Sequence, residues 1–295
     1  MVKNRKRYLE AYLFLIPIIT FLAAFKYYPF FTGIFRAFYR WNAANIDKFV
    51  GLDNFIELFK DANFGAAFRN ILIYSASFLI INLTMPLFAA VLTYNIRNER
   101  LKKFFRLGFV VPMVVPMMVI ILMWRWIYGG SFGVLNQFLQ MIGLERWSHA
   151  WLGEPSTALG AIIFINFPWI SGIYYLIYLA GLNNIPIDLH ESAQIDGINH
   201  IQRLWYIDIP LIISQIKLVV MYALIVAMQV FQQPLVLTSG GPGTSTLTPA
   251  LYMYQQAFTY DRFGYASSIG VILFIVLMAL TIINQYIVKE NDKLD

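Results

Sequence analysis

Long apolar stretches run through the chain, and shorter polar stretches separate them. A helix that spans a bilayer needs about 20 mostly apolar residues, whereas a spanning strand needs about 10 residues of alternating polarity. The apolar stretches here do not alternate, so they predict membrane-spanning helices. We expect six such helices, at residues 11–31, 71–94, 107–128, 157–181, 216–237 and 265–288.

Prolines inside these stretches do not exclude helices. Pro112 and Pro116 lie in the third stretch, and Pro168 lies in the fourth. Membrane helices accommodate proline where neighbouring groups satisfy the freed backbone carbonyls. The first stretch follows a basic N-terminus, as a secretory signal would, but it is long and no small-residue cleavage site follows it. We therefore expect a retained helix there.

The composition agrees with a membrane protein. Of the 295 residues, 59% are hydrophobic and only 13% are charged, whereas soluble domains carry about 25% charged residues. The absence of cysteine excludes a disulfide framework, a thiol nucleophile and thiolate metal ligands. The net charge of +6 does not predict binding to nucleic acid, because the basic residues gather at the ends of apolar stretches, where they suit lipid.

Basic residues also predict which side of the membrane each connecting segment occupies. Four of them precede the first expected helix, five lie within residues 95–106, and Lys289 and Lys293 lie near the C-terminus. Cytoplasmic segments carry an excess of Lys and Arg, so these three regions should share the cytoplasmic side. Both termini would then be cytoplasmic, in a multi-pass protein of the cell inner (cytoplasmic) membrane. The acidic segment 191–210 falls on the same side and does not follow the rule.

The connection between the fourth and fifth expected helices, residues 183–210, predicts two short helices that meet at a glycine. Pro186 and Asp188 suit the first turn of a helix, and Gly197 suits a left-handed position at its end. Two interpretations are open: a connector that lies on lipid, or a surface that docks on another protein. Interfacial helices usually present basic faces. This segment is acidic, which suits a partner surface that carries Arg or Lys.

The same segment resembles the EAA motif of bacterial ABC importer permeases. That pattern is E-A-A, three residues, G, nine residues and I-x-L-P. Here it is Glu191-Ser192-Ala193, three residues, Gly197, nine residues and Ile207-Asp208-Ile209-Pro210. The spacing matches throughout, with Ser192 in place of Ala and Ile209 in place of Leu. Residues 50–58, 123–139 and 237–258 are further similar to the carbohydrate-uptake branch of that family.

The resemblance implies an all-α integral membrane protein with six transmembrane helices of the type I ABC importer permease fold. Residues 1–10 would form a cytoplasmic N-terminus, residues 11–290 the permease domain and residues 291–295 a C-terminal tail. The helix at 188–197 would be the coupling helix, which lies in a cleft of an ATP-binding subunit. The implied coupling residues are Glu191, as the acidic contact, Gly197, as the turn, and Ser192, Ala193, Asp196 and Pro210.

The resemblance also implies partners. These are a second homologous permease subunit, two ATP-binding subunits, an extracytoplasmic solute-binding protein and the lipid membrane. No Walker motif is present, so ATP and Mg would be used by partner subunits, and this chain would bind no cofactor. The stretch 239–245 lacks the lysine of a phosphate loop. In the family it is an external loop, so Gly240, Gly241 and Pro242 are candidate contacts with the binding protein; a plain turn is the alternative.

Uncharged polar and aromatic residues inside two expected helices are candidate contacts with the cargo. Polar groups at membrane depth are costly unless they have a partner, and they often mark a pathway. Aromatic faces stack on the C–H faces of sugar rings, and amides match sugar hydroxyls. The same residue types also join helices or anchor them at interfaces, so packing is the alternative. The candidates are Asn166, Trp169, Ser171, Tyr174, Gln229, Gln232 and Gln233.

We therefore expect the permease subunit of an ATP-driven importer of a sugar, and more specifically of an oligosaccharide. Glycerol-3-phosphate or a related polyol phosphate is the alternative cargo, which the lack of a buried Arg or Lys disfavours. A secondary carrier usually needs an intramembrane carboxylate, and we find none in the core of the second, fourth or sixth helix. A membrane-embedded enzyme would need a nucleophile with a base, or a metal cluster. The sequence groups no such residues inside the spans, so we expect neither catalysis nor a metal site.

Overall fold

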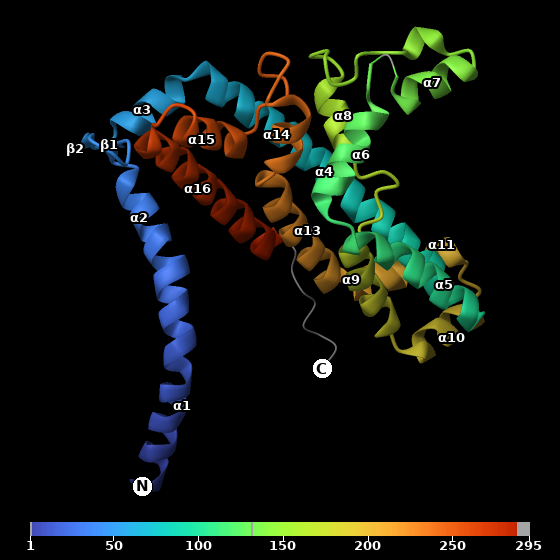
Figure 1. Ribbon diagram of the computed structural model, residues 1–295. Helices are drawn as coiled ribbons and strands as arrows, with labels where there is room; N and C mark the ends of the chain where they lie inside the picture. Colours follow the sequence, from blue (N-terminus) through green and yellow to red (C-terminus); the bar gives the residue numbers. More distant parts are fainter. Residues whose placement is uncertain (1, 131, 288–295) are drawn as a thin grey trace. The chain divides into compact units, whose positions relative to one another are not determined.

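The computed structural model describes residues 2–130 and 132–287, and helices dominate the described chain (Figure 1). Contacts divide the chain into two compact units. Unit 1 comprises Met1–Asp61 and Tyr252–Phe274, and unit 2 comprises Ala62–Leu251 and Ile275–Asp295. Two helices have residues in both units, namely α15 (Pro249–Phe258) and α16 (Phe263–Ile287).

Unit 1 begins with an almost unbroken helical stretch whose apolar side chains are exposed. Along this stretch, Phe14 is 89% exposed. Such a surface needs an apolar surrounding, which agrees with a position in lipid. The elements of unit 1 outside the two shared helices are α1 (Val2–Leu22), η1 (Ala23–Tyr27), α2 (Tyr28–Arg36), β1 (Tyr39–Trp41), β2 (Asp47–Phe49) and α3 (Asp53–Lys60).

A small antiparallel hairpin follows α2. In its register Tyr39 lies opposite Phe49. The turn is held by the Oδ1 atom of Asn42, which accepts hydrogen bonds from the backbone N–H groups of residues 44, 45 and 46. The buried Asn54 of α3 donates to the backbone oxygens of Ala37 and Tyr39. One amide side chain thus joins α3 to the hairpin, because buried backbone carbonyls need donors.

Unit 2 has its core where α4, α9 and α13 meet. Three tyrosines of α9, Tyr174, Tyr175 and Tyr178, are buried there against alanines and branched residues of the other two helices. The elements of unit 2 outside the shared helices are α4 (Ala62–Tyr94), α5 (Glu99–Val110), η2 (Val111–Val114), α6 (Met117–Ile127), α7 (Val134–Met141), η3 (Glu145–Trp147), α8 (Ala158–Phe164), α9 (Gly172–Asn183), α10 (Ile187–Ile195), α11 (His200–Arg203), η4 (Leu204–Asp208), α12 (Ile209–Leu211), α13 (Ile213–Met228) and α14 (Gln232–Thr238).

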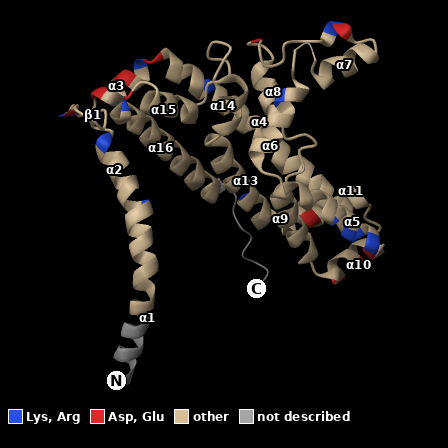
Figure 2. Cartoon of the chain, in the orientation of Figure 1, with Lys and Arg blue, Asp and Glu red and all other residues tan. Residues whose placement is uncertain are grey.

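Four of the expected spans coincide with helical stretches that are long and apolar enough to cross a bilayer. They are Tyr12–Arg36, Ala62–Tyr94, Ile213–Thr238 and Phe263–Tyr286. Figure 2 shows long helices such as α13 and α16 almost free of charge, while basic side chains gather on α5. The described chain therefore has several apolar helices, as a multi-pass membrane protein requires.

The third expected span is bent instead of straight. Its two halves, Glu99–Val114 and Met117–Ile127, meet at an angle of 91°. Pro112 and Pro116 lack a backbone N–H, and Val115 is extended because it precedes a proline. The sequence gives the positions of these prolines, but the expectation of a simple helix through them does not hold.

The fourth expected span is divided into α8 and α9. Residues 165–171 between them are not regular helix, and Trp169 has a left-handed backbone with φ of 62°. Counting the bent pair as one span gives at most five spans in the described residues, by length and composition. The number of six and the cytoplasmic termini therefore stay predictions, and so do the limits of the permease domain.

Candidate functional site

The loop at 183–210 forms the two short helices that its sequence predicts. Asp188 lies in the first turn of α10, and Gly197 has a φ of 72° just beyond its end. The N–H of Gly197 donates to the oxygen of Gln194 at 3.1 Å, and that of Ile198 donates to the oxygen of Ala193 at 3.0 Å. These two bonds are the Schellman arrangement, which satisfies the last carbonyls of a helix and favours glycine at the left-handed position.

The second helix of the loop starts with a reciprocal cap. The Asn199 side chain accepts from the N–H of Gln202 at 2.9 Å, and the Gln202 side chain accepts from the N–H of Asn199 at 3.0 Å. Such a capping box satisfies two free donors at a helix start. The chain then continues through α11, the π-helix η4 and α12 into α13.

Most of the expected coupling residues lie on the surface of unit 2. Ala193 is buried, and it packs inside the unit rather than toward a partner. The exposed members are Glu191, Ser192, Asp196, Gly197 and Pro210. Large apolar side chains accompany them, since Ile195 and Trp205 are also exposed. An exposed apolar surface beside acidic groups suits docking on a protein better than contact with water.

All seven candidate cargo residues line one cavity of unit 2. Its volume is ≈ 1130 Å³, and its lining includes Asn166, Trp169, Ser171, Tyr174, Gln229, Gln232 and Gln233. They come from the irregular segment between α8 and α9, from the start of α9, and from the junction of α13 and α14. Segments that lie about sixty positions apart in the sequence are thus brought to the same cavity. Whether these residues contact a cargo stays a prediction.

Gln233 and Trp169 differ in whether their buried polar atoms have hydrogen-bond partners. Gln233 is buried, and its Oε1 accepts from the Tyr74 hydroxyl at 2.9 Å. The indole Nε1 of Trp169 is also buried, but no group in the described part of the chain accepts from it. A buried donor without an acceptor is costly, and the left-handed backbone of Trp169 adds strain at the same residue.

The cavity also contains residues that the sequence analysis left out. Tyr74 and Asn82 of α4 and Tyr222 of α13 line it. The sequence analysis selected uncharged polar residues inside the fourth and fifth expected helices. The same criterion, applied to the second helix and to the whole of the fifth, would have selected these three residues. None of the described residues that line the cavity is Lys, Arg, His, Asp or Glu.

The loop that follows α14 carries Gly240, Gly241 and Pro242. Two threonines fix it: the hydroxyl of Thr246 donates to the oxygen of Gly241 at 2.8 Å, and that of Thr248 donates to Val230 at 2.9 Å. Asn70 of α4 donates from Nδ2 to the oxygens of residues 244 and 247. The loop is therefore a fixed part of unit 2. Its contact with a binding protein stays a prediction.

The described residues contain no group of three or more His, Asp or Glu side chains that could hold a metal ion. His190, however, is buried beside Asp208, with its Nε2 atom 2.9 Å from Oδ1. The sequence analysis did not select this pair, because the two residues lie on different helices. One signal was available: His190 and the buried Ala193 are three residues apart, and so face the same side of α10.

Comparison with known proteins decides the family. The sequence profile of the "binding-protein-dependent transport system inner membrane component" family matches residues 83–291. The chain belongs to this family. The resemblance noted in the sequence is thereby confirmed, and the family is defined by transport rather than by a catalysed reaction.

Similar proteins align with nearly the whole length of this permease. It is 35% identical over 286 residues to the "Probable ABC transporter permease protein YurN" of Bacillus subtilis (strain 168), covering 95% of this chain and 96% of that one. It is 33% identical over 269 residues to the diacetylchitobiose uptake system permease protein NgcF of Streptomyces coelicolor, covering 88% of this chain and 76% of the other.

A solved structure supports the fold. The permease aligns with a chain of a bacterial ABC transporter that imports the acidic polysaccharide alginate, with a TM-score of 0.86, 24% identity and 99% of each chain covered. A structure of a bacterial alginate transporter has also been determined with a periplasmic protein that carries an alginate pentasaccharide. The ABC importer permease fold expected from the sequence is thus confirmed.

Proposed function

We propose that this chain is the permease subunit of an ATP-driven importer that moves an uncharged oligosaccharide across the cytoplasmic membrane. The main support for this proposal is the cavity of unit 2, which is lined by all seven polar and aromatic residues that are candidate contacts with the cargo. Its volume of ≈ 1130 Å³ exceeds the usual range for small-molecule sites, about 300–1,000 Å³. A cavity of this size suits a cargo of more than one sugar ring.

The chemistry of the lining suits a neutral sugar. Amide side chains of Gln229 and Gln232 offer donors and acceptors for hydroxyl groups, and the rings of Trp169, Phe167 and Trp124 offer faces for C–H groups. Trp169 adds a buried N–H donor that has no acceptor among the described residues. A hydroxyl group of the cargo would supply that acceptor.

The absence of charge in this lining disfavours the alternative cargoes. Glycerol-3-phosphate or another polyol phosphate would need Arg or Lys to balance its charge in a low dielectric, and the described lining has neither. One similar protein belongs to a diacetylchitobiose uptake system, and a structurally similar chain belongs to an importer of the acidic polysaccharide alginate. The lining therefore supports a neutral sugar over an acidic one. A proton- or sodium-coupled carrier is disfavoured as well, since the described lining has no carboxylate.

We further propose that the energy comes from two ATP-binding subunits, which would bind ATP and Mg and contact the loop at 183–210. Glu191 and the exposed apolar residues of α10 suit a cleft in such a subunit. A second permease subunit would complete the passage, and an extracytoplasmic binding protein would deliver the cargo near Gly240, Gly241 and Pro242. The family name, which specifies binding-protein-dependent transport, supports the last partner.

The first experiment is purification of the tagged chain from membranes, with mass spectrometry of the proteins that co-purify. The proposal expects ATP-binding subunits and a second permease. The complex is then placed in vesicles with its binding protein, and uptake of labelled neutral oligosaccharides is compared with uptake of labelled glycerol-3-phosphate. Uptake of the phosphate alone would overturn the sugar assignment, and a chain that purifies alone would overturn the importer assignment.

Variants of the cavity test its role in that same assay. Trp169→Phe keeps an aromatic ring, although a smaller one, and removes the N–H, so we expect KM for the sugar to rise about 2- to 10-fold, the usual effect of one lost hydrogen bond. Gln229→Ala combined with Gln232→Ala should reduce uptake further without loss of assembly. Trp147→Phe and Gln140→Ala are matched controls, because both residues are exposed and lie outside the cavity lining. Equal uptake by all four variants would contradict the cavity assignment.

A further inference from the structure

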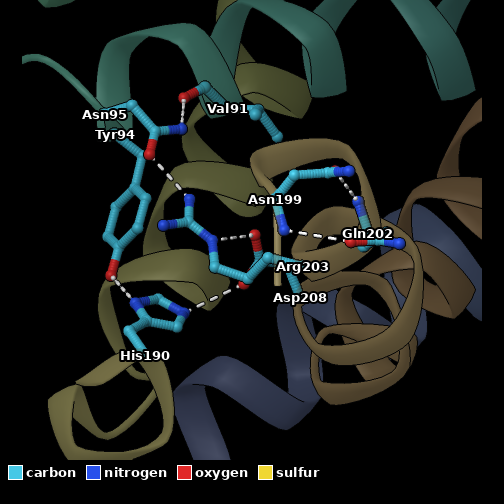
Figure 3. A network of polar contacts seen from close by, with 8 residues as sticks. All are labelled: Val91, Tyr94, Asn95, His190, Asn199, Gln202, Arg203 and Asp208. Atoms are coloured by element: carbon cyan, nitrogen blue, oxygen red, sulfur yellow. Dashed lines mark hydrogen bonds and ion pairs between the residues drawn. The ribbon is translucent and has the colours of Figure 1, made fainter. Parts of the chain in front are cut away.

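A closed ring of polar contacts joins both helices of the 183–210 loop to the end of α4 (Figure 3). Asp208 accepts from Nε2 of His190 at 2.9 Å and from Nε of Arg203 at 3.3 Å. Arg203 also donates to Oδ1 of Asn95 at 2.6 Å, and Nδ1 of His190 lies 3.2 Å from the Tyr94 hydroxyl. The contacts thus leave α4 through Tyr94, pass through α10, η4 and α11, and return through Asn95, the residue directly after α4.

The centre of this ring is buried. The side chain of Asp208 is 1% exposed, and those of His190 and Arg203 are 7% and 9% exposed. A buried carboxylate is costly unless hydrogen-bond donors and an opposite charge surround it. Arg203 supplies the charge, and His190 supplies a second donor. Removing any of the three would leave a buried polar group without its partner.

The hydrogen positions in the ring follow from its chemistry. An ionised carboxylate only accepts, so Nε2 of His190 carries the hydrogen that faces Asp208. The Tyr94 hydroxyl, which can both donate and accept, is a complementary partner for the other nitrogen, Nδ1. Every member of the ring therefore has a complementary partner.

Local backbone structure orients Asn95 toward Arg203, and Arg203 toward Asp208. Asn95 donates from Nδ2 to the oxygen of Val91 at 2.7 Å, which fixes its Oδ1 for Arg203. The segment Leu204–Asp208 is a π-helix, whose hydrogen bonds run between residues five apart. Arg203 and Asp208 are also five residues apart, so this unusual turn brings the guanidinium to the carboxylate.

The helix that receives the ring also lines the cavity. Tyr74, Phe78 and Asn82 of α4 face the cavity, and Tyr94 lies at its last turn. From Asn82 to Tyr94 is twelve residues, which corresponds to about 18 Å along a helix. One continuous helix therefore connects the ring with the cavity.

We propose that His190, Arg203 and Asp208 are positioning residues that fasten the coupling helix α10 to α4, so that both move as one body. This rests on the proposed function, in which ATP-binding subunits push on α10. Without these contacts, a helix of nine residues would absorb that push by tilting. Fastened to α4, it transmits the displacement toward the cavity along one continuous helix, and packed secondary elements are one means by which distant sites are coupled.

The test measures how readily a reagent reaches the cavity, so the cargo need not be known. The chain has no cysteine, so Gln229→Cys gives a single thiol in the cavity lining. Its rate of reaction with N-ethylmaleimide is measured in the full complex, with and without ATP and vanadate. We expect the ATP-dependent change in rate to shrink roughly tenfold when Asp208→Asn or Arg203→Gln is added. ATP hydrolysis and co-purification of the subunits should persist.

Two further variants separate positioning from simple loss of structure. Arg203→Lys keeps the charge beside Asp208 and should retain most of the ATP-dependent change. His190→Gln should reduce it, whereas His200→Gln, the same substitution at an exposed histidine of α11, should leave it unchanged. A full ATP-dependent change in Asp208→Asn and Arg203→Gln would overturn the proposal.

Hydrogen exchange distinguishes failure of this proposal from failure of the proposed function. If no ATP-binding subunit accompanies the unaltered chain, or ATP leaves the thiol reaction unchanged, the importer assignment falls. Exchange of the amides at 187–209 still reports on the ring. Faster exchange in Asp208→Asn than in His200→Gln would support the fastening of α10, and equal exchange would overturn it.

Discussion

At the scale of single residues, Gly197 shows how one backbone angle shapes the surface that faces a partner. Its φ of 72° lies in the left-handed region, which costs an L-residue with a side chain roughly 1–2 kcal/mol. No heavy atom lies within 4 Å of a Cβ added there. Within this chain an added Cβ therefore meets no clash, and the cost of a substitution comes from the backbone angle.

We predict that Gly197→Val lowers cargo import per ATP hydrolysed, because a β-branched residue resists the left-handed angle and redirects the end of α10. Gly197→Asn should be close to the unaltered protein, since asparagine tolerates that region best among residues with a side chain. Import and hydrolysis are measured together in vesicles. If Gly197→Val and Gly197→Asn import the same amount of cargo per ATP hydrolysed, the backbone angle at residue 197 does not matter for coupling.

At the scale of elements, close packing of α9 on α13 holds the core of unit 2 together. A Cβ at Gly181 would lie 2.9 Å from Cδ and Cγ of Gln215 and 3.1 Å from Cγ2 of Ile212. These distances are below ordinary van der Waals contact, so the side chains of Gln215 and Ile212 occupy the space that a side chain at residue 181 would need.

We predict that Gly181→Ala destabilises the permease by about 1–3 kcal/mol, the usual cost of overpacking. Gly160→Ala is the matched control, because Gly160 is also helical and no heavy atom lies within 4 Å of an added Cβ. At that position alanine should stabilise by about 0.5–1 kcal/mol. Thermal unfolding of both variants in detergent measures the difference, and a Gly181→Ala protein as stable as Gly160→Ala would contradict the packing argument.

At the scale of the whole molecule, the distribution of basic residues predicts the orientation in the membrane. Residues 95–106 and both ends of the chain are rich in Lys and Arg, and such segments stay in the cytoplasm. The loop at 183–210 should face the same side, and the loop at Gly240 and Gly241 should face the opposite side.

We predict that a thiol at Gln194→Cys reacts with a membrane-impermeant maleimide only after the membrane is opened, whereas Gly241→Cys reacts in intact cells. Both positions suit a label, since Gln194 is exposed and an added Cβ at Gly241 has its nearest neighbour at 3.4 Å. The cysteine-free chain supplies the background. The reverse pattern would overturn the predicted orientation.

The sequence by itself determined the class of protein, most of the long apolar helices, and the two-helix loop with its left-handed Gly197. Each of these depends on local chemistry: length and polarity of a stretch, caps, and a glycine at a helix end. The EAA spacing and three further stretches predicted the family, which the comparisons then confirmed. The seven cavity candidates were also selected from local pattern, because polar groups inside apolar stretches stand out without any knowledge of their neighbours.

Only the tertiary structure decided which of these residues meet. The bend at Pro116 and the left-handed Trp169 depend on how neighbouring elements pack, since proline permits a bend without fixing its angle. The cavity exists because α4, the 165–171 segment and the junction of α13 and α14 converge. The pairing of His190 with Asp208 spans eighteen positions. No local pattern specifies such a contact, because the energy of a buried charge depends on partners that folding brings to it.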